Sequence, residues 1–79
     1  MIYKIGTKIM FKEMKLKQYG ANKGEIFTII ETKKRDSNNT YAKIKNKRLE
    51  PKKLYHTNIF EIATDRDILE YKIKSSFIN

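Results

Sequence analysis

The amino-acid sequence predicts a mainly β fold, a single domain of five short strands followed by a short tail. The chain has 79 residues, enough for one domain with a small core. Short stretches in which apolar and polar residues alternate, the period of a half-buried strand, are separated by polar turns. We therefore expect residues 1–63 to form the β domain and residues 64–79 a tail, which packs on it or forms an interface.

The first strand is expected near the amino terminus. Ile9 and Phe11 alternate with other residues in the stretch KIMFK, so both are expected to face the core. The next segment, residues 12–23, is polar and is expected to form a long connection. Two of its side chains, Met14 and Leu16, are expected to fold back onto the core.

The stretch YGANKGEIFTII contains two glycines and then a run rich in β-branched and aromatic residues. Gly20 and Gly24 suit turn positions with a positive φ angle. The glycine spacing of the known phosphate-binding loops is absent, so these glycines predict a turn instead of a phosphate site. The run that follows has apolar residues on both faces, which favours a central, curved second strand.

A charged turn and a third strand are expected next. Residues 33–39 have the composition of a turn that ends in two asparagines, and residues 40–46 alternate again. One face of this strand carries Ala42 and Ile44. The opposite face carries three side chains that are expected to meet solvent: Tyr41, Lys43 and Lys45.

The fourth and fifth strands are expected on either side of a short bend. Pro51 cannot donate a hydrogen bond to a neighbouring strand, so the fourth strand is expected to be an edge strand or to be broken there. The stretch LYHT predicts a bend. Residues 58–62 then predict the fifth strand, in which Phe60 and Ile62 share a face.

The tail combines two patterns. Thr64 or Asp65 suits the cap of a helix, and acidic residues in a first turn favour one. The alternation of apolar residues after it favours an extended segment, so we expect a short helical turn followed by extended chain. Its apolar side chains are expected to pack on the domain or, alternatively, to form a homodimer interface through Leu69, Tyr71, Ile73 and Phe77.

The net charge is +9, from 18 basic and 9 acidic residues, and it is unevenly distributed. Residues 1–60 hold 15 basic and 5 acidic side chains, a difference of +10, and residues 61–79 hold 3 and 4, a difference of −1. A field of this kind attracts nucleic acid or an acidic protein surface. The alternative is that the lysines reflect the composition of an AT-rich genome.

Several functions are disfavoured by composition. The chain has no cysteine, which removes disulfides, thiolate metal sites and cysteine nucleophiles, and no cofactor is expected. Lys4 and Lys8 interrupt the first apolar stretch, so we expect no membrane segment there and a cytoplasmic protein. His56 is the single histidine and has no candidate partner nearby in sequence. We therefore expect no enzyme, with a toxin-like ribonuclease that uses His56 as the minor alternative.

The order of these segments resembles an SH3-like small β-barrel. The resemblance rests on the stretches IGTKI, YGANKGEI, TYAKI and NIFEI and on Leu54. In this respect the chain is similar to small SH3-like proteins of phage and prophage genomes and, more distantly, to KOW-type and Tudor-type barrels. The resemblance implies a five-stranded barrel with a binding function, such as a phage accessory protein in a host cytoplasm. The chain has no tryptophan, so binding of proline-rich peptides is not expected.

The strongest candidate site is a basic surface with tyrosines between the cations. Lysine and arginine pair with phosphates, arginine in a bidentate manner, and tyrosine stacks on unpaired bases. We predict nucleic-acid binding, with an inhibitor or adaptor that binds an acidic host protein as the second hypothesis. The alternative to both is a solvated outer face whose lysines prevent aggregation of an edge strand. The predicted residues are Lys33, Lys34, Arg35, Tyr41, Lys43, Lys45, Lys47, Arg48, Lys52, Lys53 and Tyr55.

Overall fold

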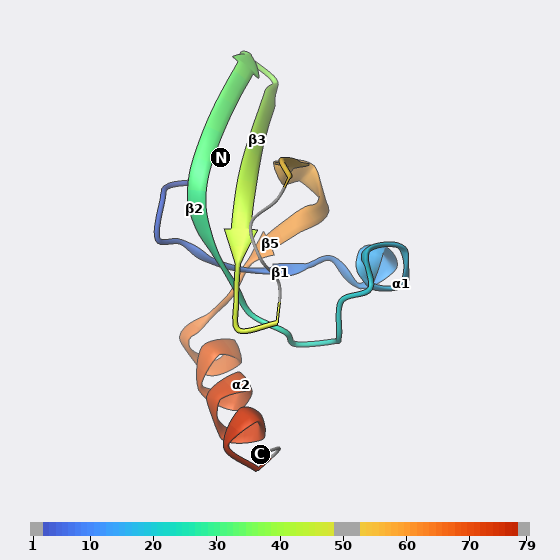
Figure 1. The fold of residues 1–79 in the computed structure, drawn as a ribbon, viewed down its shortest axis with the longest axis vertical. Coiled ribbons are helices and arrows are strands. Elements are labelled where there is room, and N and C mark those ends of the chain that lie inside the picture. The colour runs from blue at the N-terminus through green and yellow to red at the C-terminus, as the bar shows by residue number, and fades with distance from the viewer. Residues whose placement is uncertain (1–2, 49–52, 78–79) are drawn as a thin grey trace.

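The computed structural model describes residues 3–48 and 53–77, with side chains as far as Lys74. Within these residues, five antiparallel strands form one sheet in the order β4-β3-β2-β1-β5 (Figure 1). The strands are β1 (Lys8–Phe11), β2 (Phe27–Asp36), β3 (Asn39–Lys45), β4 (Tyr55–His56) and β5 (Phe60–Ile62). The helical elements are η1 (Glu13–Lys15), α1 (Leu16–Tyr19), η2 (Thr57–Ile59) and α2 (Asp65–Phe77). The predicted mainly β fold with five strands is confirmed.

One face of the sheet carries the hydrophobic core. The alternation in β1 and β3 buries the side chains that the sequence predicted for this face, because successive residues of a strand point to opposite sides. In β2 the buried side chains are Phe27 and Ile29. The core cluster consists of Ile9, Phe11, Phe27, Ile29, Ala42, Ile44, Ile59 and Phe60.

The two edge strands of the sheet lie close together. β4 and β5 are joined only by the single turn η2, and Tyr55 on β4 contacts Phe60 on β5 with ring centroids 6.3 Å apart. Phe11 on β1 lies between them, 5.9 Å from Tyr55 and 5.3 Å from Phe60. The Lys12 N–H donates to the Ile59 carbonyl at 2.9 Å. The sheet is therefore strongly curled, although no strand pairing between β4 and β5 closes it in the described residues.

β2 and β3 form a longer hairpin than the sequence predicted (Figure 1). The expectation of a turn over residues 33–39 is wrong, because β2 continues through Asp36 and only Ser37 and Asn38 form the turn. The Asp36 carboxylate accepts hydrogen bonds from the Asn38 N–H and the Asn39 amide, both at 2.9 Å. This one carboxylate holds the tight turn. The charged residues before it are extended because they pair with β3.

The bend expected in LYHT is also wrong, because its middle two residues form β4. Tyr55 pairs with Ala42, and His56 pairs with Tyr41. Pairing with β3 holds these residues extended, a long-range constraint that local sequence does not reveal. The fourth strand that was predicted around Pro51 falls largely outside the described residues.

The fifth strand is shorter than predicted. The helical turn η2 occupies the beginning of the range 58–62, and the strand itself holds three residues. Phe60 is buried, as expected for the core face, but Ile62 is 46% exposed at the edge of the sheet. The prediction that both share a buried face therefore holds only for Phe60.

The long connection after β1 is helical. η1 and α1 follow each other, and α1 ends at Gly20, whose φ of 67° provides the left-handed cap. Gly24 has a φ of 79°, so both glycines occupy the predicted turn positions. Leu16 packs against the core as expected. Met14 is 82% exposed, and its predicted burial is wrong because η1 turns it toward solvent.

The tail is one helix, so the predicted extended segment is wrong. Thr64 caps α2: its hydroxyl accepts from the Asp67 N–H at 3.1 Å, and its own N–H donates to the Asp67 carboxylate at 2.9 Å. Arg66 and Glu70, one turn apart, are linked at 3.1 Å. These local interactions favour the helix over the strand that the alternation indicated.

The four tail residues predicted for a homodimer interface do not share one environment. Leu69 and Ile73 lie four residues apart on the helix and are both exposed. Tyr71 is partly buried, and the side chain of Phe77 lies outside the described part of the structure. The interface itself remains a prediction.

Phe11 is the residue whose removal is expected to affect the fold most. It contacts four other rings, those of Tyr19, Phe27, Tyr55 and Phe60. We expect Phe11→Ala to lower the free energy of unfolding by about 3–5 kcal/mol, which is most of the stability of a small domain. Urea denaturation followed by circular dichroism measures this. Met14→Ala is the matched control, and it should change stability by less than about 0.5 kcal/mol; similar losses in both variants would contradict the proposed core.

Candidate nucleic-acid interface

The strand register places a group of cations on the outer face of the hairpin. Lys33 lies opposite Tyr41, Lys43 lies opposite Glu31, and Lys45 lies opposite Thr28. Because residues opposite each other point to the same side of a sheet, these side chains share the face turned away from the core. Arg35 follows an irregularity in the register, but it belongs to this face as well because its guanidinium lies over the Tyr41 ring. We call Lys33, Arg35, Tyr41, Lys43 and Lys45 the basic face.

Tyr41 is the centre of this face and is already in contact with two neighbours. The Arg35 guanidinium carbon lies 5.7 Å from the centre of the Tyr41 ring, a cation–π contact. The His56 ring meets Tyr41 edge-on at 5.1 Å. A shallow depression of about 260 Å³ is lined by Lys33, Arg35, Tyr41 and Leu54. An incoming base would therefore meet the Arg35 plane and Tyr41 together, so Tyr41 is not a freely exposed platform.

His56 is held by a chain of hydrogen bonds that determines its tautomer. The Asn58 N–H donates to His56 Nδ1 at 3.0 Å, so this nitrogen is the acceptor. The other nitrogen, Nε2, therefore carries the proton and donates to the Asn39 side-chain oxygen at 2.8 Å. The Asn39 amide nitrogen in turn donates to Asp36. Both ring nitrogens are thus used in fixing η2 and the hairpin turn, a structural role that the isolated histidine in the sequence did not indicate.

The same chain lowers the pKa of Asp36. The Asn39 side-chain amide, followed by the Asn38 N–H, stabilises the carboxylate and keeps its pKa below the ordinary value. Asp36 therefore stays ionised near neutral pH, as the acceptor that the hairpin turn requires.

Other predicted site residues lie away from the basic face. Lys34 pairs with Thr40 and points to the opposite side of the hairpin. Tyr55 belongs to the aromatic core, and the Lys53 ammonium lies 5.1 Å from the centre of its ring. Lys47 and Arg48 line a separate pocket, and Lys52 lies outside the described residues.

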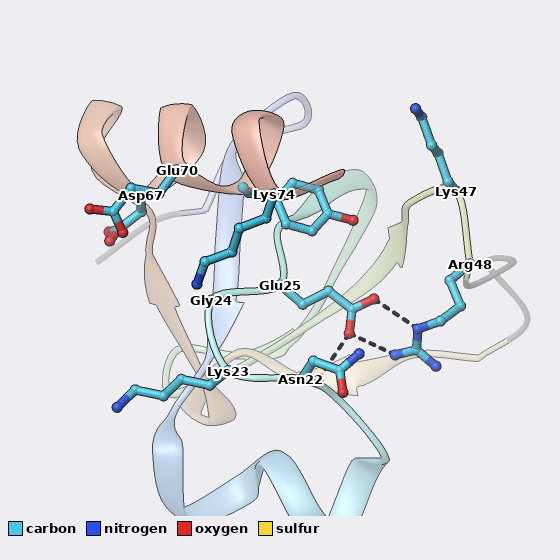
Figure 2. Close-up of a pocket in the computed structure, with 10 residues that line it drawn as sticks. Asn22, Lys23, Gly24, Glu25, Lys47, Arg48, Asp67, Glu70 and Lys74 are labelled. Carbon is cyan, nitrogen blue, oxygen red and sulfur yellow. Dashed lines mark hydrogen bonds and ion pairs between the residues drawn. The ribbon is translucent and has the colours of Figure 1, made fainter. Parts of the chain in front are cut away.

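That pocket lies beside α2 (Figure 2). In the ribbon view, α2 is at the end of the molecule opposite the hairpin turn (Figure 1). Its volume is about 530 Å³. It is formed by the loop before β2, the turn after β3 and the first three turns of α2. The lining residues are Asn22, Lys23, Gly24, Glu25, Lys47, Arg48, Asp67, Glu70, Tyr71 and Lys74.

A buried carboxylate in this pocket is held by a bidentate ion pair (Figure 2). The Glu25 side chain is 4% exposed, and its two oxygens accept from Arg48 Nη2 at 2.7 Å and Arg48 Nε at 2.9 Å. The Asn22 N–H and the Asn46 amide also donate to it, at 3.0 and 2.8 Å. Arg48 reaches the Gly20 carbonyl as well, at 3.1 Å. Arg48 therefore joins the turn after β3 to both ends of the loop between α1 and β2, and it is not available to the basic face as the sequence predicted.

Burial and hydrogen bonding act on the pKa of Glu25 in opposite directions. Burial alone raises the pKa, because it disfavours the charged form. The hydrogen bonds from Arg48, Asn22 and Asn46, together with the Arg48 charge, outweigh burial and hold the pKa below its ordinary value. No prediction from the sequence included this ion pair. Its only local signal was an acidic residue between a glycine turn and an apolar run.

The acidic residues of the pocket on α2 are also engaged. Asp67 accepts from Thr64 at the cap of the helix, and these hydrogen bonds lower the pKa of its carboxyl group. Glu70 pairs with Arg66 at 3.1 Å. The pocket is consequently a structural junction with mixed charges, and it does not present a single class of recognition group.

Among residues 3–48 and 53–77, no group of three or more His, Cys, Asp or Glu side chains is placed to hold a metal ion. In the same part of the chain, no helix has the length and apolar character needed to cross a bilayer. No protein-family model matches the chain, and searches of curated proteins and of solved structures found no match.

The Glu25–Arg48 pair leads to a prediction about stability. Arg48→Leu leaves a buried carboxylate without its cation, so we expect the free energy of unfolding at neutral pH to fall by about 2–3 kcal/mol. This is less than for a fully buried pair because the Arg48 side chain is 51% exposed. Urea denaturation measures it, with Lys47→Leu as the neighbouring control that should be nearly neutral. Equal stability of the two variants would show that the pair contributes little.

We also expect the effect of Arg48→Leu on stability to depend on pH. Folding lowers the pKa of Glu25. The stability that the ionised Glu25 contributes to the fold is therefore fully present above the unfolded pKa of about 4.3, and it is lost as the pH falls through the folded pKa. The stability difference between the wild type and Arg48→Leu should therefore shrink on acidification. Asp36 and Asp67, whose pKa values are also lowered, are present in both proteins, so they cancel in this difference. A difference that stays constant into the acid range would contradict the linkage.

Proposed function

We propose that this protein is a small SH3-like β-barrel that binds nucleic acid through the basic face. The observation that carries the proposal is the β2–β3 register, which brings four cations and a tyrosine to one side of the hairpin. Phosphates take up lysine and arginine charges, and this electrostatic term supplies most of the affinity of many nucleic-acid-binding proteins.

The barrel interpretation is supported by topology. The strand order β4-β3-β2-β1-β5, with the single helical turn η2 between β4 and β5, brings the two edges of the sheet together around Phe11. This is the arrangement that the sequence resemblance implies. The inner side of the curled sheet is occupied by the hydrophobic core, so we assign binding to its outer surface.

The basic face is available for an incoming polyanion. Within the described residues, Lys33 and Lys45 have no acidic partner, and Lys43 has one, Glu31, at 3.8 Å. Both side chains of this ion pair are partly or largely exposed, and such pairs contribute only about 0–1 kcal/mol. A phosphate can therefore replace Glu31 at little cost.

Stoichiometric binding fits the site better than catalysis. His56, the residue of the ribonuclease alternative, has one ring nitrogen accepting from Asn58 and the other donating to Asn39. A general base needs a nitrogen that reaches the substrate, and here both are used within the fold. We therefore propose that the protein acts by stoichiometric binding to nucleic acid, without catalytic turnover.

Neutralising the centre of the basic face tests this proposal. We expect Lys43→Gln combined with Lys45→Gln to weaken nucleic-acid binding and to reduce the slope of log affinity against log salt by about 1.8 for duplex DNA, roughly 0.9 per lost phosphate contact. Fluorescence anisotropy with labelled DNA and RNA over a series of salt concentrations measures both. The fold should be kept, because Lys45 is exposed and Lys43 contributes only a weak ion pair.

The control for this test is Lys12→Gln combined with Lys17→Gln. Both lysines are exposed and lie on the connection after β1, outside the basic face, and the variant loses the same net charge. Equal loss of affinity in the two variants would indicate a generic positive field. Absence of measurable binding at physiological salt would overturn the proposed function.

A further inference from the structure

Within the part of the chain that the structure describes, the distal part of the β2–β3 hairpin has no neighbouring strand. β1 pairs with β2 only at Phe27 and Thr28, and β4 pairs with β3 only at Tyr41 and Ala42. Residues 34–40 therefore form a ribbon two strands wide, with the Lys33–Tyr41 pair at its base. None of residues 33–40 is buried. In Figure 1 this ribbon projects from the body at the end opposite α2.

This ribbon carries cations on both of its faces. Lys33 and Arg35 point to one side with Tyr41, whereas Lys34, opposite Thr40, points to the other. All three cations are exposed. A hairpin that lay flat on a nucleic acid would use only one of these faces, because the other would be turned to solvent. Cations on both faces suit a binding site with phosphates on two sides.

The ribbon is also ordered before binding. Asp36 holds the turn through Asn38 and Asn39, and Asn39 continues to His56 on β4. The Arg35 guanidinium rests on Tyr41. Because these contacts fix the turn relative to the body, less conformational entropy is lost when the ribbon enters a site. Ser37 and Asn38 are exposed at the turn, where they present neutral hydrogen-bonding groups.

We propose that this ribbon enters the major groove of duplex DNA, an inference that rests on the proposed function and names its ligand. The B-DNA major groove is about 12 Å wide and accepts a two-stranded β-ribbon, with a phosphate backbone along each wall. Lys33 and Arg35 then face one wall and Lys34 the other. The amide of Asn38 reaches the base edges, where asparagine pairs with adenine. The major groove of duplex RNA is too deep and narrow for this.

Insertion into the major groove is tested by measuring how tightly the full-length protein binds three labelled ligands. These are a DNA duplex, an RNA duplex of the same sequence and the single DNA strand. We expect the RNA duplex to bind at least roughly tenfold more weakly than the DNA duplex. Methylation interference separates the grooves, because N7 of guanine lies in the major groove and N3 of adenine in the minor groove. Interference at guanine N7 is expected. Equal affinity for both duplexes, or interference only at adenine N3, would overturn the proposal.

Variants on the two faces of the ribbon form the second arm of the test. Lys33→Ala and Lys34→Ala should each weaken DNA binding, roughly threefold to tenfold, and each should lower the salt slope by about 0.9. Lys17→Ala on α1 is the matched control and should change neither.

The outcomes separate this inference from the proposed function. If Lys33→Ala weakens binding and Lys34→Ala does not, the hairpin binds by one face, and groove insertion is wrong while the proposed function stands. Tighter binding to the single DNA strand than to the DNA duplex would likewise show that groove insertion is wrong while the proposed function stands. If no form of nucleic acid binds at physiological salt, both proposals fail together.

Discussion

The packing of Phe11 against its aromatic neighbours is the contact on which the rest of this structure depends. A chain of this length buries little surface, so its core must be used efficiently. The side chain of Phe11, on β1, packs between Tyr55 of β4 and Phe60 of β5. These contacts hold the two edges of the curled sheet near each other. η2 connects these two edges, and the pairing of His56 with Tyr41 places the histidine next to the hairpin. The packing of the inner surface and the strand pairing of β4 therefore determine together how the outer surface is arranged.

The hairpin is held in two different ways along its length. Near the body, Ile29 and Ala42 are buried and the core fixes the strands. Beyond this point no buried residue remains, and cross-strand pairing together with the Asp36 turn keeps the strands together. A two-stranded ribbon is marginal by itself in water, which explains why the turn carboxylate and the His56 link accompany it. Freedom from packing also leaves both faces of the ribbon open to a ligand.

Sequence periodicity predicted the parts of the fold in which one face is buried, such as the alternation around Ile9 and around Ile44. It failed where both faces meet solvent, because Lys33 and its neighbours show no apolar alternation and resemble a turn. It also failed where a distant partner decides the conformation, as in β4. The ion pair between Glu25 and Arg48 joins residues 23 positions apart, so no local pattern reveals it. The basic strand face around Tyr41 was predictable because it depends on alternation alone.

The distribution of ion pairs bears on whether the positive charge is only a matter of composition. Several acidic residues have local structural roles: Glu25 holds Arg48, Asp36 holds a turn and Asp67 caps α2. An acidic group that is engaged in this way compensates charge close to itself, and little of its field reaches beyond about one Debye length of roughly 8 Å at physiological salt. On the hairpin, the only ion pair among the described residues is the weak contact of Lys43, and the Asp36 carboxylate lies close to Arg35. The other hairpin cations, Lys33, Lys34 and Lys45, have no acidic partner within this part of the chain. Positive charge therefore remains where the core is absent and the backbone projects, which is the combination that the proposed groove-binding ribbon requires.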